Sequence, residues 1–119
     1  MDNTTNIEAL KKITQQFCEE RNWDQFHNPK DLAIGASTEA NELLELFRFV
    51  SEKDTLVKMQ NADFKEMVEQ ELSDVFFFVL RFAQLNNIDL TTAFQNKMKR
   101  NAAKYPVETS KNSNKKYNE

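Results

Sequence analysis

The chain has 119 residues, which is the size of one domain, and a net charge of −3. It contains one Gly, two Pro and ten Phe, and this shortage of turn-forming residues predicts an all-helical protein. The negative charge argues against a broad surface for a nucleic-acid polymer, and no apolar run is long enough to span a membrane. A single Cys and an N-terminus without a signal-peptide pattern lead us to expect a cytoplasmic protein.

The first predicted helix opens at Thr5-Asn6-Ile7-Glu8, a pattern that is typical of a capping box. Cys18 lies at the edge of its apolar face, where we expect an inert packing residue. The inward stripe predicted from the helical period consists of Ile7, Leu10, Ile13 and Phe17.

The segment that follows, residues 21–32, breaks the helical period, and Asn28-Pro29 marks it as a loop. It holds Trp23, Phe26 and His27, the only histidine of the chain. Two interpretations are open: the rings close the end of a helical bundle, or they form a stacking surface for a planar ligand. The Glu-x-x-His pattern of a di-iron carboxylate site is absent.

The second predicted helix runs from about Pro29 to about Glu52. Gly35 lies one turn before Glu39 on the same face, where it lets a neighbouring helix or a ligand approach closely. A connection that includes a short helix is predicted for residues 53–62. The apolar stripe of the second helix consists of Leu32, Ala36, Leu43, Leu46, Phe47 and Val50.

Two pairs of acidic residues stand inside the helical patterns, and the spacing within each pair puts its members side by side on one face. In the second helix Glu39 falls inside the apolar stripe and Glu42 on its edge. The third predicted helix opens at the capping-type sequence 63–66 and continues to about residue 85. There Glu71 falls inside the stripe and Asp74 on the same edge. That stripe consists of Phe64, Val68, Leu72, Val75, Val79 and Phe82.

Carboxylates that face a core need an opposite charge, a proton or a bound cation, and four converging carboxylates raise one another's pKa values. A hard divalent cation such as Mg²⁺ is the simplest compensation, because it takes oxygen ligands and keeps waters for a phosphate substrate. Solvated salt bridges on an ordinary bundle are the alternative. Two acid pairs at matched positions favour the metal site, with Glu39, Glu42, Glu71 and Asp74 as its ligands.

The third helix also carries three consecutive phenylalanines, residues 76–78, which cannot all face one core. Phe77 is predicted to point away from Val75, with Leu80 on the same outer side. A helix that is apolar on more than one side is buried on more than one side. In a chain of this length, the pattern predicts a subunit interface.

A fourth helix is predicted from a cap at Asp89 or Thr91 to about residue 104, and Pro106 ends it. Polar residues follow its apolar stripe on or beside the same face, and two interpretations are open. Either the lysine side chains at the helix end extend their charged groups into solvent, or the polar residues contact the phosphate, ribose or base of a ligand. These residues are Lys97, Asn101, Lys104 and Tyr105. We expect one domain over residues 1–106 and a polar, mobile tail over residues 107–119.

Glu39-x-x-Glu42 followed by Glu71-x-x-Asp74 resembles the motif of the all-α MazG-like nucleoside triphosphate pyrophosphohydrolases. The loop over residues 21–27, the run over residues 69–75, and the segment from Lys97 to Pro106 are similar to the dCTP pyrophosphatase branch. The tail over residues 113–117 is similar too. The resemblance covers the chain from about residue 14 onward.

This resemblance implies a four-helix bundle that assembles into dimers which pair as tetramers, with each pocket lined by more than one chain. It implies Mg²⁺, with Mn²⁺ as a substitute, bound by the four acids, and hydrolysis of a dNTP, dCTP-like favoured, to dNMP and pyrophosphate. It also assigns Trp23 and His27 to the base and sugar pocket, and Lys97 and Asn101 to substrate contacts.

Several positions depart from the pattern of that branch. Thr38 and Asn41 stand where glycines often precede the first two acids, and Phe49 replaces a tryptophan that stacks on the base. Phe78 replaces a tyrosine one turn after the last acid, and Thr14 stands in place of a histidine. These changes leave the metal chemistry intact and concern the choice of base.

The predicted mechanism is metal-assisted hydrolysis, in which Glu39 or Glu42 orients or deprotonates the attacking water. Lys97 and Lys104 would steady phosphate oxygens as point charges. The biological role would be removal of unwanted deoxynucleotides. The alternatives are a non-enzymatic helical interaction module and a metal-binding regulatory protein.

Overall fold

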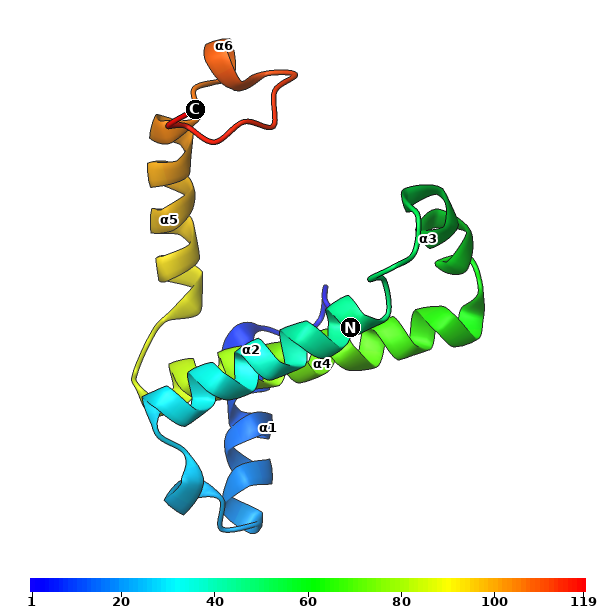
Figure 1. Ribbon diagram of the computed structural model, residues 1–119. Coiled ribbons are helices and arrows are strands. Elements are labelled where there is room, and N and C mark those ends of the chain that lie inside the picture. The colour runs from blue at the N-terminus through cyan, green and yellow to red at the C-terminus, as the bar shows by residue number, and fades with distance from the viewer. The chain divides into compact units, whose positions relative to one another are not determined.

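The computed structural model describes all residues from Met1 to Glu119, and every regular element in it is a helix (Figure 1). The four long helices expected from the sequence correspond to α1, α2, α4 and α5. Helix α3 corresponds to the short helix expected in the connection over residues 53–62, and the short α6 was not expected. In chain order the elements are α1 (Ile7–Glu20), the 3₁₀ turn η1 (Asp24–Phe26), α2 (Pro29–Glu45), α3 (Glu52–Lys58), α4 (Ala62–Leu85), α5 (Leu90–Lys104) and α6 (Val107–Ser110).

The chain divides into two compact units, Met1–Asn87 and Ile88–Glu119, and each is described by itself. Because every regular element is a helix, the all-helical class predicted from composition is confirmed. The four-helix bundle, its assembly and the domain boundary at residue 106 stay predictions. None of the helices combines the length and the apolar character that crossing a membrane requires.

Each long helix starts at a side chain that accepts a hydrogen bond from a backbone N–H of the first turn, as helix N-termini require. The predicted capping box at Thr5 is wrong, because Asn6 caps α1 by accepting from the N–H of Ala9 at 2.8 Å. The start predicted at Asp63 is also displaced, since Asn61 caps α4. The other caps are Asn28 for α2, Ser51 for α3 and, of the two residues predicted for α5, Asp89.

Helix α2 ends at Glu45, seven residues before the end expected from the apolar pattern. The chain turns over residues 46–50, where Phe49 has a φ of +66°. That left-handed conformation cannot continue a right-handed helix. The apolar residues Leu46, Phe47 and Val50 are half-buried in this turn instead.

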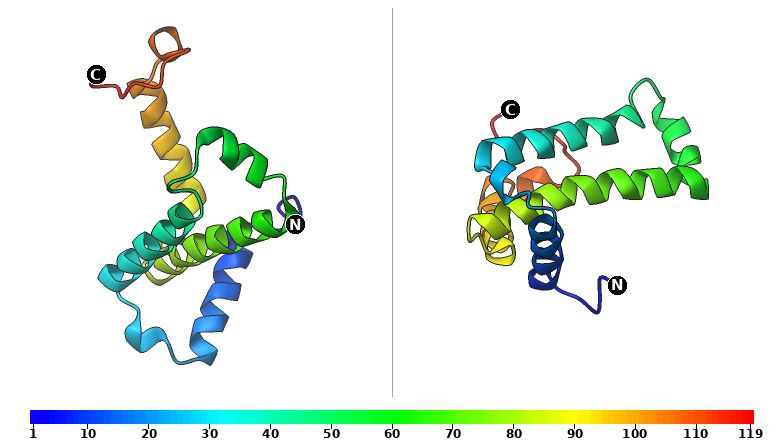
Figure 2. Two further views of the ribbon diagram at one scale, coloured as in Figure 1. Left: turned by 45° about the vertical axis from the view of Figure 1, so that its right-hand side comes forward. Right: turned by 90° about the horizontal axis from the view of Figure 1, so that it is seen from below.

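Helices α2 and α4 lie side by side and antiparallel, with α3 connecting them at one end (Figure 2). Near the start of α2, Gly35 lies directly against the ring of Phe78. Near its end, the rings of Phe47 and Phe64 meet edge to face, with centroids 5.6 Å apart. The two contacts fix the register of the pair, and the two acid pairs, Glu39 with Glu42 and Glu71 with Asp74, fall between them.

Helix α1 packs on a second side of α4, and its inward face differs from the predicted one. Ile13 was expected in the core and is mostly exposed, whereas Cys18, expected at the edge, is fully buried. Thr14 is buried too, and its hydroxyl donates to the carbonyl of Leu10 at 2.9 Å, so the polar group costs little to bury.

The packing of α1 also corrects the prediction for the outer side of α4. Leu80 is buried, and Phe77 contacts Phe17 of α1 with ring centroids 6.0 Å apart, so neither residue points outward. The large apolar side chains left exposed on α4 are Met67 (49%) and, further along the helix, Leu72 (51%), Phe76 (39%) and Val79 (38%), and the last three lie together. Together with Ser73 and Val75 they line a shallow hollow, which we call the outer strip.

In the second unit, α5 carries a mostly exposed apolar face, including Phe94 and Met98. The tail after α6 returns to the end of α5. The ring of Tyr117 lies edge-on to Tyr105 at 6.0 Å, and Lys104 Nζ lies 4.9 Å from its centroid.

The Gly35 contact yields a stability prediction. A Cβ at residue 35 would lie 2.3 Å from the nearest carbon of the Phe78 ring, which Phe77 also contacts. Gly35→Ala should lower the free energy of unfolding by roughly 1–3 kcal/mol, although Ala favours a helix, because the ring must move. Urea denaturation would measure the loss. Ser37→Ala, at an exposed position of the same helix, should show no such loss, and a Gly35→Ala variant as stable as wild type would contradict the packing.

Candidate functional site

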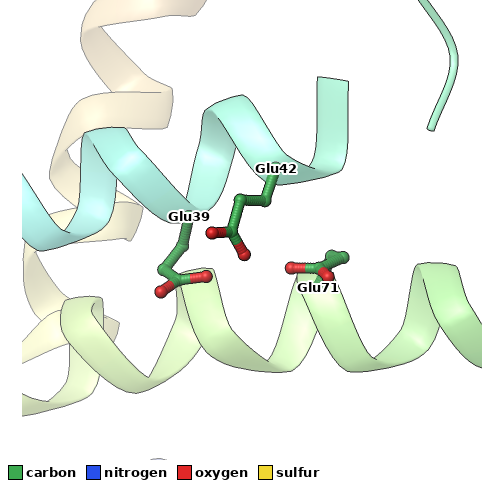
Figure 3. Close-up of side chains that lie close together, drawn as sticks. All are labelled: Glu39, Glu42 and Glu71. Atoms are coloured by element: carbon green, nitrogen blue, oxygen red, sulfur yellow. The ribbon is translucent and has the colours of Figure 1, made fainter. Parts of the chain in front are cut away.

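Three carboxylates point into the space between α2 and α4: Glu39 and Glu42 from α2, and Glu71 from α4 (Figure 3). Each offers one oxygen, and these three oxygens all lie within 4.8 Å of one another. The three-residue spacing puts Glu39 and Glu42 on the same side of α2. The antiparallel register then brings Glu71 against them.

Two of these carboxylates are held in an unfavourable state. One oxygen of Glu39 and one of Glu71 are buried and receive no hydrogen bond. Burial raises the pKa of Glu39, and the neighbouring carboxylate of Glu42 raises it further. The same two causes, in the same order, raise the pKa of Glu71.

Asp74, the fourth acid predicted for the site, does not join the group of three. It is exposed and stands one turn after Glu71 on α4. Its negative charge still contributes to the raised pKa values of Glu39 and Glu71, so it lies close enough to interact with both. The structure therefore brings three of the four acids together and leaves Asp74 at the rim.

The chemistry of this donor set suits a hard divalent cation. All the available atoms are carboxylate oxygens, and two of them are buried without a partner. The salt-bridge interpretation loses support, because Arg48 and Arg81 pair with Glu45 and Asp24 instead. Glu39, Glu42 and Glu71 could hold the cation directly, with Asp74 available beside them.

Within the first unit, Trp23 and His27 of the aromatic loop pack against each other, and Trp23 also packs against α1. The ring of Trp23 packs edge-on to Phe17 at 5.5 Å and to His27 at 6.2 Å, yet Trp23 remains 36% exposed. The ring contacts of Trp23 agree with the interpretation that the loop closes the end of the bundle. A stacking role of its exposed surface toward a planar ligand stays a prediction. Phe26 is largely exposed.

Arg81 of α4 was missed by the sequence analysis. It is fully buried and donates from Nε to Nδ1 of His27 at 2.9 Å and from Nη1 to the side-chain oxygen of Gln84 at 2.6 Å. Its other terminal nitrogen pairs with Asp24 of the loop. Burial, and then the charge of Arg81, lower the pKa of His27. A charged residue inside the apolar stretch 75–83 was the available signal.

Phe49 lies in the turn between α2 and α3 and is 94% exposed. The guanidinium of Arg48 stands 4.7 Å from its ring centroid. An exposed ring on a left-handed backbone is uncommon for a bulky residue, and such strain occurs often at functional sites.

The sequence pattern of the MazG-like family matches residues 34–119, which include all four acids and Phe49. The chain belongs to the MazG-like family. It is 32% identical to dCTP pyrophosphatase 1 of Rattus norvegicus over 111 residues, 93% of this chain and 65% of that protein. It is 30% identical to dCTP pyrophosphatase 1 of Homo sapiens over 113 residues, 95% of this chain and 66% of that protein. The chain thus spans slightly less than two thirds of the length of these relatives.

A solved structure of a pyrophosphatase from Archaeoglobus fulgidus DSM 4304 has the same fold. It superposes with a TM-score of 0.78 at 34% identity, covering 83% of this chain and 91% of that chain. The similarity extends to most of both molecules. The MazG-like resemblance inferred from the two acid pairs is therefore confirmed.

The remaining residues predicted to contact substrate belong to the second unit of this MazG-like chain. Lys97 and Lys104 are exposed on α5, and Tyr105 ends that helix. Asn101 is half-buried and its amide nitrogen lies 3.8 Å from the sulfur of Met98. Their roles toward a substrate stay predictions.

The acid cluster predicts how the metal-free protein responds to pH. The pKa values of Glu39 and Glu71 are raised in the folded chain. At a pH between the ordinary Glu pKa and these raised values, the folded state therefore binds more protons than the unfolded state. Their contribution to stability is thus complete below the ordinary Glu pKa and is lost as pH rises through the raised values. Thermal unfolding in EDTA, from mildly acidic to neutral pH, should show Glu71→Gln gaining stability relative to wild type as pH rises.

At neutral pH, added Mg²⁺ should restore the stability of wild type relative to Glu71→Gln, since a cation that binds only the folded state stabilises it. Glu71→Gln should respond less. A difference between wild type and Glu71→Gln that does not vary with pH or Mg²⁺ would contradict the proposed strain among these carboxylates.

Proposed function

We propose that this chain is a Mg²⁺-dependent nucleoside triphosphate pyrophosphohydrolase that converts a dNTP into dNMP and pyrophosphate. The observation that carries the proposal is the group of three carboxylates between α2 and α4, with two buried oxygens that lack any partner. Membership of the MazG-like family supports it, as do the pyrophosphatases among the similar proteins.

Glu39, Glu42 and Glu71 would hold the metal, with Asp74 completing the set or binding a second ion. When bound, Mg²⁺ would neutralise charge on the triphosphate and stabilise the charge that develops at the α-phosphorus. Mn²⁺ would serve as a substitute, since it takes the same oxygen ligands.

One of the two acids of α2 would also act as the general base of the reaction. The oxygen of a water molecule bonds to the α-phosphorus, the bond from that phosphorus to the bridging oxygen breaks, and pyrophosphate leaves. A carboxylate oxygen of Glu39 or Glu42 accepts the proton that the water loses. Both residues stand on the same face of α2, so either can reach a water held between the helices.

Three aromatic residues are proposed to bind the nucleoside. Trp23 would offer an exposed face for stacking, His27 a hydrogen bond, and Phe49 a second ring from the turn after α2. A dCTP-like base is favoured because dCTP pyrophosphatases are among the relatives. In the second unit, Lys97 and Lys104 would contact phosphate oxygens as point charges, with Asn101 and Tyr105 beside them. The biological role would be nucleotide-pool house-cleaning in the cytoplasm.

We propose further that the chain assembles with copies of itself, most simply as a dimer of dimers. The outer strip on α4, with Leu72, Phe76 and Val79, is an exposed apolar surface of the kind that marks association sites. A second copy would cover it through isologous contacts. No role for a membrane or a nucleic-acid polymer is proposed.

The acid cluster can be tested by turnover. Purified protein, incubated with each dNTP and Mg²⁺, should release equal amounts of dNMP and pyrophosphate. Replacing Glu39, Glu42 or Glu71 by Ala should lower kcat/KM by roughly 100-fold or more, because each loss weakens charge stabilisation in the transition state. Circular dichroism should show that the variants remain folded.

Glu66→Ala is the matched control, since it removes an exposed acid from α4 outside the group of three, and its activity should equal that of wild type. Near wild-type turnover by Glu71→Ala would refute the metal assignment. Release of inorganic phosphate in place of pyrophosphate would refute the position of cleavage.

The assembly can be tested by mass. Light scattering after size exclusion should give a multiple of the 14.0 kDa chain for wild type. Leu72→Glu should place a charge in the outer strip and shift the mass toward the single chain, because burying an unpaired carboxylate is costly. A wild-type mass of one chain would refute the proposal, and Leu44→Glu, at an exposed apolar position on α2, is the control.

A further inference from the structure

The proposed reaction gives no role to the buried guanidinium of Arg81. It extends from α4 beneath the aromatic loop and has no exposed surface. All three of its nitrogens are engaged: Nε with His27, one terminal nitrogen with Gln84 and the other with Asp24. Two of these partners belong to the loop, 54 and 57 residues earlier in the chain.

The contact with His27 determines where the imidazole carries its hydrogen. An arginine Nε–H only donates, and arginine keeps its proton in proteins. Nδ1 of His27, 2.9 Å away, must therefore present its lone pair. The neutral ring then carries its hydrogen on Nε2, where it is a donor.

The same contact keeps the ring neutral. In water an imidazole gains a proton at a pH of about 6.5 and can carry a single hydrogen on either nitrogen. Here the charged groups facing the ring are Arg81 and Asp24, and burial together with Arg81 lowers the pKa of His27. A protonated ring would turn an N–H toward the guanidinium, which cannot accept it.

We propose that Arg81 is a positioning residue that locks His27 as a neutral Nε2–H donor to an acceptor atom on the nucleoside part of the substrate. This inference rests on the proposed function. Trp23 packs against His27 with ring centroids 6.2 Å apart and is partly exposed, so we take its ring as the planar partner of that donor. A flat face with one neutral donor fits an uncharged acceptor on a base or sugar, whereas a phosphate is better matched by a cation.

The tautomer can be measured directly because the chain has one histidine. Long-range ¹H–¹⁵N correlation spectra of the labelled full chain at neutral pH should show His27 solely as the Nε2–H form. Arg81→Met should give a mixture of tautomers and raise the pKa of the ring. Arg21→Gln removes a nearby exposed arginine that does not bond to His27, and should leave both unchanged.

An Nδ1–H form or a mixture in wild type would overturn the inference, even if Arg81→Met fails to fold. An Arg81→Met spectrum identical to that of wild type would overturn it as well.

Ligand binding tests the second half of the proposal. The fluorescence of the single tryptophan should report binding of dCMP to wild type. His27→Asn keeps an oxygen near the Nδ1 position for Arg81 but lacks the Nε2 donor. It should weaken dCMP about two- to tenfold, the effect of one neutral hydrogen bond, and raise KM for dCTP with little change in kcat.

Analogues identify the acceptor and provide the control. If the effect of His27→Asn disappears with the 3′-deoxy nucleotide, the acceptor is the sugar hydroxyl; if it disappears only with the abasic sugar phosphate, the acceptor is on the base. Inorganic tripolyphosphate should bind wild type and variant equally, and a loss confined to phosphate affinity would overturn the proposal. If wild type neither binds nor cleaves any nucleotide, the proposed function fails, and the spectra still decide the role of Arg81.

Discussion

The repulsion among three carboxylates is the constraint on which the arrangement of this protein depends. Glu39, Glu42 and Glu71 would separate if their helices were free to do so, because their charges and the burial of two of them oppose ionisation. Apolar contacts on both sides of the acids hold α2 and α4 together. The helices meet closely at Gly35 and Phe78, and the rings of Phe47 and Phe64 meet further along.

Packing energy is thus used to keep charges close in the absence of a cation. Apolar burial stabilises a folded chain without regard to direction, whereas a group of carboxylates is useful only in a fixed geometry. The same division of roles recurs at the aromatic loop. There Phe17 and Phe77 supply the apolar contacts, and Arg81 supplies the fixed hydrogen bonds that orient the polar side chains.

Much of this could be predicted from the sequence, because long periodic segments identify helices and matched acid pairs identify the faces that meet. The predictions failed where a second partner decides the outcome. A projection of one helix cannot show that Phe17 of α1 contacts Phe77 or that Leu80 is buried, and the exposed ring is that of Phe76. Nor does periodicity reveal that Arg81 can be buried, since its acceptors come from a distant loop. The early end of α2 depends on a backbone conformation that its apolar pattern does not encode.

That turn has a consequence for how the chain can evolve. Four residues other than glycine have a positive φ, and three of them, Asn22, Asn87 and Asn112, are of the type that tolerates it best. The fourth is Phe49, whose ring is almost entirely in water and so contributes little to the fold. Selection for stability alone would replace it with Asn or Gly, which relieve the backbone. A phenylalanine at this position therefore costs stability, and if Phe49 stacks on the base as proposed, stability and activity are traded against each other there.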